Sequence, residues 1–398
     1  MNPDLDQTEP LLPKTPTNAV TFEPNDPEDP RNWSKVRKWL MVAAIVPIDL
    51  SVSWGASGFS PVASDFAKDM GVSSSVTVLG LSIPTGFVLF SFIAQGRSWH
   101  SVFRIMLVIC LAFWVVMVTA LYALGETRHS VILLRRARAM RTATGNGDLE
   151  VPNEMKQRGL KQLFSTALAR PFRFLSTEAI VQFGALYNGF LYGLSFLFNG
   201  AFHMIFGPDG YGFDTVGVGI SFLGIVLGIT VGLATNIFQE RYYQQRVSQA
   251  GNHDAPEARV HYAKLAAIVL PISLLAFALT ATPNIHPFFA VFASAFWGWS
   301  FYTLILMTLT YTEDAYKTYS ASALAGIGLI RNLAGAGFPL VGRHLFLNAG
   351  TRNASLVLMA IAICLAPIPF ILEQRGASLR KRSPWAAAHE DEDESGDN

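Results

Sequence analysis

The chain has 398 residues, of which 51% are hydrophobic and only 15% are charged, and its formal net charge is +1. About 25% of the residues in a soluble domain are charged, so this composition excludes an ordinary soluble protein. The near-neutral charge gives no support to a nucleic-acid partner. Apolar residues are grouped in blocks of about 20, the length that crosses the hydrocarbon core of a lipid bilayer. An all-α, polytopic membrane protein is therefore predicted, with the bilayer as its surroundings.

Both ends of the chain are polar. Residues 1–38 are rich in proline and acidic residues and lack the basic-then-apolar pattern of a signal peptide, which predicts a disordered cytosolic tail. Residues 374–398 are predicted to be a second such tail, because a basic piece is followed by the acidic run EDEDES. Cys110 and Cys364 lie inside apolar blocks, so they indicate small core side chains and no disulfide framework.

Nine apolar blocks are long enough to span a membrane. The predicted spans are residues 39–60, 76–95, 102–124, 178–203, 214–237, 262–281, 286–309, 320–346 and 353–372. The longest polar interruption, residues 126–176, is rich in arginine and predicts a cytosolic linker with short interfacial helices. It separates a first region, residues 39–125, from a second region of six spans, residues 177–373.

The positions of Lys and Arg give two contradictory topologies. The basic run RNWSKVRKW precedes the first span and places the N-terminus in the cytosol, and the arginines of the linker favour the same side. Moving one Arg through the bilayer centre costs at least ~2.5 kcal/mol. Three spans before the linker would nevertheless place it outside. Either one of these three blocks does not cross the membrane, or the first region is an incomplete module.

A polar stripe interrupts the apolar sequence LYNGFLYGLSFLFNG of the fourth predicted span. Asn188, Tyr192, Ser195 and Asn199 follow one another at spacings of four, three and four, which places them on one helix face. Such a stripe can hydrogen-bond to neighbouring helices, or it can form the wall of a water-filled cavity. Both interpretations remain open from the sequence.

Ionisable residues inside membrane spans are costly and often functional. Asp49 and Glu178 are the candidates for carrying a proton, although Glu178 lies near a helix start, where a carboxylate also suits the helix dipole. Arg331 lies in the interior of its span and needs a carboxylate, a carbonyl or a water molecule as partner. Together with the polar stripe, Arg331, Trp297 and Tyr302 make up the predicted substrate cavity.

The fifth predicted span has small residues at regular spacing. Gly224, Gly228 and Gly232 lie four residues apart, which predicts close packing of this helix against another. Enzyme signatures are absent from the sequence: the eight histidines are scattered singly, and no metal-binding spacing or nucleotide-binding loop occurs. The sequence therefore predicts neither an enzyme nor a metal or cofactor site, but a transporter-like body of packed helices.

Several segments resemble a known family. DPRNWSKVRKWL is similar to the entry into the first helix of fungal major facilitator superfamily transporters of the drug:proton antiporter group, and GVSSSVTVLGLS to the start of their second helix. LARPFRFLSTEAIVQFGALYNGFLYGLSFLF resembles their seventh helix, and DAYKTYSASALAGIGLIRNLAGAGFPL resembles the tenth-to-eleventh loop and the eleventh helix. On that last stretch, the family-like positions are Tyr316, Ser320, Ala323, Arg331, Phe338 and Pro339.

The resemblance has one gap. The family has twelve helices in two bundles of six, but SFIAQGRSWHSVFRIMLVI passes from what resembles the second helix directly to the end of the fifth. Helices three and four, with parts of two and five, therefore have no counterpart here. This departure predicts an intact C-terminal bundle and a truncated N-terminal one, with about nine spans in place of twelve, and it accounts for the contradictory topologies.

The resemblance implies a function. Members of this group export small organic molecules by proton antiport, so a monomeric efflux transporter in the plasma membrane is expected, with a secondary metabolite or toxin as its substrate. Drugs and polyamines are alternative substrates. Because alternating access requires two bundles that move about a central site, a truncated remnant or a product of a mis-assembled gene is the second interpretation.

Overall fold

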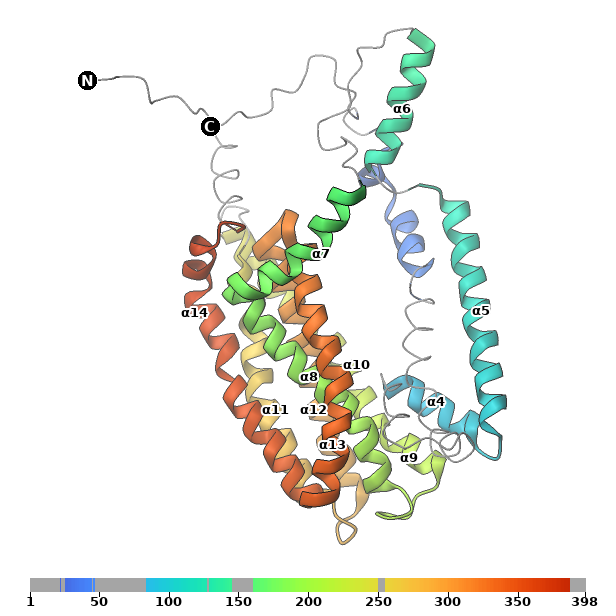
Figure 1. Ribbon diagram of the computed structural model, residues 1–398, viewed down its shortest axis with the longest axis vertical. Coiled ribbons are helices and arrows are strands. Elements are labelled where there is room, and N and C mark those ends of the chain that lie inside the picture. Colours follow the sequence, from blue (N-terminus) through green and yellow to red (C-terminus); the bar gives the residue numbers. More distant parts are fainter. Residues whose placement is uncertain are drawn as a thin grey trace, which may run out of the picture. The chain divides into compact units, whose positions relative to one another are not determined.

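The computed structural model describes residues 22, 26–44, 46, 84–126, 129–144, 160–249 and 255–386. Secondary structure in these residues consists of helices joined by short turns, without a strand (Figure 1). The elements are η1 (Pro30–Asn32), α4 (Pro84–Ala94), α5 (Trp99–Leu124), α6 (His129–Thr144), α7 (Leu160–Thr177), α8 (Ala179–Phe206), α9 (Thr215–Ser221), α10 (Leu223–Gln249), η5 (Pro256–Val260), α11 (His261–Thr280), α12 (Pro287–Tyr316), η6 (Lys317–Tyr319), α13 (Ser320–Leu365) and α14 (Pro367–Arg382). The predicted all-α, polytopic fold is confirmed.

Seven helical segments of the described part are long and apolar enough to cross a membrane. Each overlaps one of the last seven spans predicted from the sequence. The first predicted span, residues 39–60, falls largely outside the described residues, and residues 76–83 of the second, 76–95, also fall outside them. The described part of the second one is α4, with 11 residues, and the short turn that follows it.

The chain forms two compact units. Residues 1–50 and 111–163 make up the first, and residues 51–110 and 164–398 make up the second. In the first unit, an Arg37 guanidinium nitrogen donates to the carbonyl of Leu124 at 2.8 Å, and Arg136 forms an ion pair with Asp26. These contacts hold a stretch of the predicted N-terminal tail in place, because a buried carboxylate such as Asp26 needs a charged partner.

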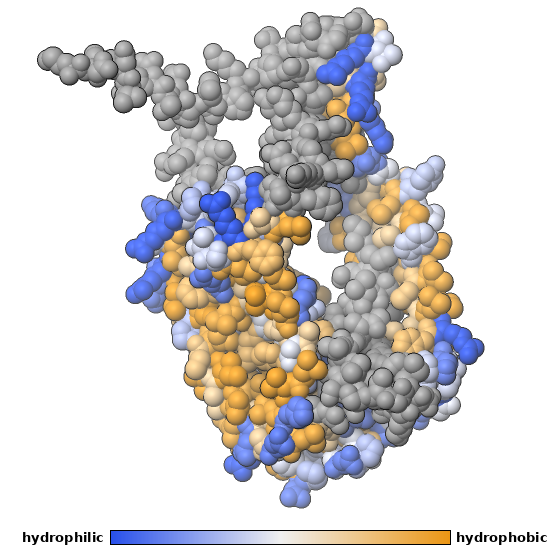
Figure 2. Space-filling model, viewed as in Figure 1, coloured by the Kyte–Doolittle hydropathy of each residue, from blue (hydrophilic) through white to orange (hydrophobic). Residues whose placement is uncertain are grey.

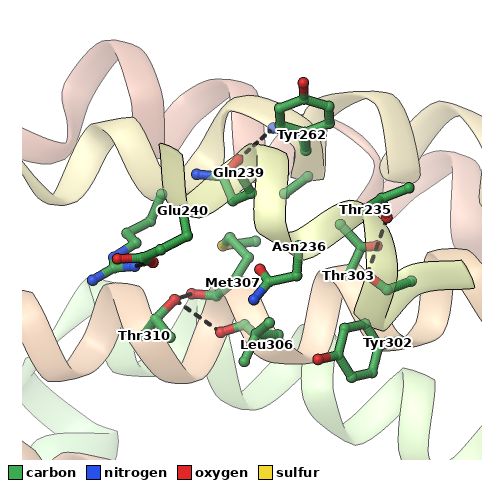
Figure 3. Close-up of a pocket in the computed structure, with 13 residues that line it drawn as sticks. Thr235, Asn236, Gln239, Glu240, Tyr262, Tyr302, Thr303, Leu306, Met307 and Thr310 are labelled. Carbon is green, nitrogen blue, oxygen red and sulfur yellow. Dashed lines mark hydrogen bonds and ion pairs between the residues drawn. The ribbon is translucent and has the colours of Figure 1, made fainter. Parts of the chain in front are cut away.

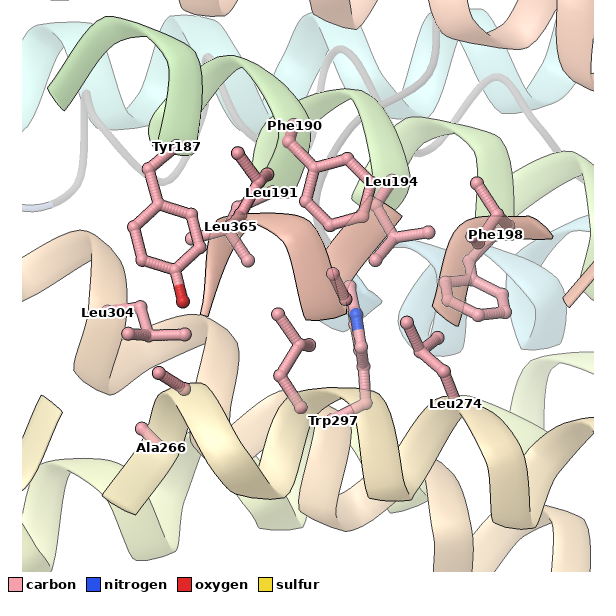
Figure 4. Packing of buried hydrophobic residues seen from close by; sticks show 14 of the residues in the cluster. Tyr187, Phe190, Leu191, Leu194, Phe198, Ala266, Leu274, Trp297, Leu304 and Leu365 are labelled. Atoms are coloured by element: carbon pink, nitrogen blue, oxygen red, sulfur yellow. The ribbon is translucent and has the colours of Figure 1, made fainter. Parts of the chain in front are cut away.

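The second unit contains a bundle built from α8 to α14 around one hydrophobic core. α8 is its most buried span, with 72% of its most apolar window inside the protein. Figure 4 shows Tyr187 and Phe198 of α8 turned toward Trp297 and Leu304 of α12. The Phe198 ring meets the ring of Trp297 edge-on, with centroids 5.2 Å apart. Such aromatic pairs stabilise a core by ~0.5–1.5 kcal/mol beyond their burial.

Small residues let α10 and α12 approach closely. A Cβ atom added at Gly224 would lie 2.2 Å from the carbonyl oxygen of Val291, and one at Gly228 would lie 1.9 Å from that of Ala295. Gly298 contributes from α12, since a Cβ there would lie 2.4 Å from the carbonyl oxygen of Ile225. Backbone lies against backbone at these three points, so only glycine fits.

The last two spans form a hairpin. α13 is broken at Gly350, whose φ of 76° lies in the left-handed region that glycine adopts without strain. Figure 1 shows the chain reversing direction there and returning through α14. The outer surface of this bundle carries exposed apolar side chains, and Figure 2 shows them as a broad band between hydrophilic ends. A band of this kind fits a protein surrounded by hydrocarbon.

The structure differs from the predicted C-terminal tail beginning at residue 374. α14 continues to Arg382, and the chain beyond it packs against α7. The Trp385 ring lies 5.3 Å from that of Phe174 and 5.0 Å from that of Tyr319, measured between centroids. The Ser383 hydroxyl accepts a hydrogen bond from the Trp385 amide at 3.2 Å. One aromatic side chain in a charged stretch thus orders residues that composition alone assigns to a tail.

Candidate substrate site

The polar stripe of α8 lies inside the bundle. Asn188, Ser195 and Asn199 are only 0%, 6% and 2% exposed, and Tyr192 is half-buried. The Asn188 side-chain amide donates to the carbonyl of Gly184, one turn earlier, at 3.1 Å. The stripe therefore does not form an open cavity wall in this conformation, and a ligand reaches it only if neighbouring helices move.

Arg331 of α13 joins this stripe. Its guanidinium carbon lies 4.9 Å from the centroid of the Tyr192 ring, a cation–π distance. α13 approaches α8 closely here, since a Cβ added at Gly335 would lie 3.2 Å from the Tyr192 ring. The structure thus brings together the cation and the aromatic side chain that the sequence assigned to one cavity.

Four atoms of the predicted site are buried without a hydrogen-bond partner among the described residues. They are Asn188 Oδ1, Asn199 Nδ2, Trp297 Nε1 and Arg331 Nε. Leaving such a group unpaired costs ~1–3 kcal/mol, and more when the group is charged. Native proteins keep few of them, and each one indicates a bound water, an ion or a functional role.

Trp297 and Tyr302 do not share one cavity. They are five residues apart on α12, which places them about 140° apart around the helix axis. Trp297 is 2% exposed and faces α8. Tyr302 faces α10, where a Cβ added at Gly232 would lie 2.7 Å from its ring. The predicted substrate cavity therefore divides into an α8–α13 face and a separate region around Tyr302.

Tyr302 lines a pocket between α10, α11 and α12 with an empty volume of about 490 Å³ (Figure 3). Asn236 of α10 and Thr303 of α12 also face this space. Arg259 and Glu240 border it on a second side. This volume includes space that is open to the solvent.

Only one of the two candidates for carrying a proton lies among the described residues. Asp49 lies outside the described residues. Glu178 lies between α7 and α8, is 4% exposed and accepts a hydrogen bond from the Tyr316 hydroxyl at 2.9 Å. A buried carboxylate held by one neutral donor can exchange that partner when the helices move, so Glu178 stays a candidate.

Sequence reasoning missed a network of ion pairs centred on Arg259. Its guanidinium lies 2.6 Å from Glu240 and 2.9 Å from Asp314, and its carbon lies 3.4 Å from the centroid of the Tyr243 ring. Lys264 pairs with Glu373 at 2.5 Å in the same unit, and Arg380 pairs with Glu257. The partners in these ion pairs are up to 123 residues apart in the chain, so no spacing pattern in the sequence predicts them.

Comparison with known proteins gives the family. No protein-family model matches the chain. The chain is 34% identical over 307 residues to "Efflux pump atB" of Aspergillus terreus, covering 75% of this chain and 63% of that protein. It is 33% identical over 267 residues to "Major facilitator superfamily multidrug transporter FLU1" of Candida albicans, covering 67% and 44%. The chain belongs to the major facilitator superfamily.

A third relative within the superfamily aligns along most of its length. "Major facilitator-type transporter sorT" of Penicillium rubens is 25% identical over 468 aligned positions, covering 92% of this chain and 88% of that protein. Since this chain has 398 residues, at least 70 of those aligned positions (468 minus 398) are gaps in this chain. The alignments to the first two relatives cover only about half to two thirds of their lengths.

Proposed function

We propose that this major facilitator superfamily protein exports a small organic molecule by proton antiport. The proposal rests on the four unpaired buried polar atoms of the α8–α13 face, in a chain homologous to proteins named efflux pumps and multidrug transporters. An unpaired amide, indole or guanidinium gains a hydrogen bond when a ligand enters, so helix separation and ligand binding favour each other.

The side chains at this face suggest the chemistry of the cargo. Asn188 and Asn199 supply amide donors and acceptors, the Tyr192 ring supplies a stacking surface, and Arg331 supplies a positive charge. These groups suit an amphipathic aromatic compound with hydrogen-bonding substituents, such as a secondary metabolite or toxin. Relatives named multidrug transporters support drugs as alternative cargo, and polyamines stay a further alternative. A monomer in the plasma membrane completes the proposal.

An efflux assay tests this function. Yeast cells lacking their own drug pumps express the chain, are loaded with rhodamine 6G, and are compared with empty-vector cells at acidic and neutral external pH. We expect faster export from the expressing cells, and a higher rate at acidic pH because the inward proton gradient is larger. Export equal to that of vector cells at matched protein abundance would refute transport by this chain.

Variants of the stripe test the site. Asn188→Ala and Asn199→Ala should change the ratio of export rates for two different dyes by about tenfold, the equivalent of one hydrogen bond worth ~1.4 kcal/mol. Thr230→Ala on α10 is the matched control, because its exposed hydroxyl bonds only to the carbonyl of Val226 in the same helix. If the asparagine variants lower only protein abundance, the stripe serves helix packing.

A second function class is a non-transporting remnant. It is favoured by the positions of the Penicillium rubens relative that are aligned with gaps in this chain. Sequencing the transcript across codons 86–100 distinguishes an incomplete sequence from a real deletion. Extra in-frame sequence encoding apolar helices would mean that the chain is an incomplete form of a twelve-helix carrier. Continuous sequence would mean that the deletion is real.

A further inference from the structure

The pocket around Tyr302 lies next to the close contact between α10 and α12. Gly224 and Gly228 hold the two backbones in contact, and Gly232 still accommodates only the flat Tyr302 ring. Beyond Gly232 the α10 side chains become larger and polar, beginning with Thr235 and Asn236. Both polar residues line the pocket, together with Tyr262 and Ala263 of α11.

The charged side of this pocket is internally satisfied. Arg259 is held by Glu240 and Asp314, and a second oxygen of Glu240 accepts from the Gln244 amide at 2.8 Å. Gln239 donates to the carbonyl of Ala258 at 2.8 Å and accepts from the Tyr262 amide at 3.1 Å. The two charged residues that line the pocket, Arg259 and Glu240, are paired with each other, so neither presents an unpaired charge to a ligand.

Two lining groups have unused hydrogen-bonding capacity. Neither the Asn236 amide nor the Tyr302 hydroxyl makes a hydrogen bond to any residue of the described ranges. Figure 3 shows both turned toward the side of the pocket where Leu306 lies. In contrast, the hydroxyl hydrogens of Thr303 and Thr310 are used by carbonyls of their own helix, at 2.9 Å each. Both free groups are uncharged and can donate as well as accept.

We propose that this pocket is a second ligand site, distinct from the α8–α13 face, and that it binds an uncharged ring compound carrying both a hydrogen-bond donor and an acceptor. Asn236 and Tyr302 form its polar contacts, and Leu306 and Met307 with the Tyr302 ring provide the apolar surface. The site needs no transport cycle to bind, so it stands whether or not the protein exports anything.

Equilibrium dialysis of the full chain in lipid nanodiscs tests the site, with empty nanodiscs as the blank. The probe is 7-hydroxy-4-methylcoumarin at mildly acidic pH, where its phenol donates and its lactone carbonyl accepts. We expect saturable binding that is about tenfold weaker for Asn236→Leu and for Tyr302→Phe, since each loses one hydrogen bond. The methoxy analogue, which has no donor, should also bind about tenfold more weakly.

Controls separate binding at this site from the effects of misfolding. Thr230→Val on α10, which lies outside the pocket lining, should leave coumarin binding unchanged. Asn236→Gln should retain much of it, because the amide remains. Binding that is insensitive to Asn236→Leu and Tyr302→Phe would overturn the proposal, as would binding that weakens steeply with added salt, which indicates recognition of charge. A negative result in the export assay alone would not change the interpretation of these binding measurements.

Discussion

Buried hydroxyl groups of this bundle differ in what they bond to. The Tyr316 hydroxyl donates to Glu178, whose side chain is almost fully inside the protein. The Tyr187 hydroxyl is equally buried but has no partner among the described residues. Both residues are 0% exposed, so the same substitution at the two positions isolates the value of one hydrogen bond to a carboxylate.

Tyr316→Phe should lower the free energy of unfolding by ~1.5–3 kcal/mol, because it leaves the buried Glu178 carboxylate without this donor. Tyr187→Phe should leave it unchanged or raise it slightly, since it removes an unsatisfied polar group. Denaturant unfolding of the purified protein in micelles, followed by circular dichroism, measures both. Equal losses for the two variants would contradict this assignment.

At the scale of elements, the contact between α10 and α12 depends on the absence of side chains. Gly228 is the tightest point, with the backbone of Ala295 directly against it. Gly328 of α13 provides the contrast, because nothing lies within 4 Å of a Cβ added there. Substituting each of these two glycines by alanine therefore distinguishes the effect of helix packing from the effect of helix propensity.

Gly228→Ala should destabilise the protein by ~1–3 kcal/mol or more, because the added methyl group forces two backbones apart. Gly328→Ala should stabilise it by up to ~1 kcal/mol, as expected for glycine replaced in a helix interior. Thermal unfolding of both variants in the same detergent gives the comparison. A stable Gly228→Ala protein would mean that α10 and α12 do not pack as described.

Spacing along single helices was the most informative part of the sequence. It grouped Asn188 with Asn199 on one face and predicted the small residues of α10 at a helix contact. The same spacing rule separates Trp297 from Tyr302, because five residues along a helix correspond to about 140° around its axis. Contacts between distant segments, such as those of Arg259 with Asp314 or of Trp385 with Phe174, depend on how helices pack, and no single-helix pattern encodes them.

At the scale of the whole molecule, the charge of α6 bears on the side of the membrane on which this helix lies. α6 carries Arg135, Arg136, Arg138 and Arg141, and its partner Asp26 belongs to the N-terminal stretch. Because Arg136 and Asp26 are in direct contact, α6 and this stretch lie on the same side of the membrane. The cost of translocating four arginines favours the cytosol for both.

A cysteine at Ala139, introduced into a variant with Cys110→Ala and Cys364→Ala, should react with a membrane-impermeant thiol reagent only after cells are permeabilised. Gel-shift labelling of intact and permeabilised cells measures this directly. A cysteine at Pro208, between α8 and α9, serves as the opposite reference and should react in intact cells. Reaction of the cysteine at position 139 in intact cells, with the cysteine at position 208 protected until the cells are permeabilised, would place α6 outside and support a three-span first region.

The packing of Trp385 has a consequence for proteolysis. Trypsin cleaves after basic residues and needs an extended stretch of chain, yet the bond between Arg382 and Ser383 follows a helix end and leads into a buried serine. Cleavage there requires the Trp385 side chain to leave the Phe174 and Tyr319 rings first. The rate of digestion at this bond therefore reports how often the aromatic cluster opens, and ligands that reposition α7 will show up as faster or slower cutting at a site far from where they bind.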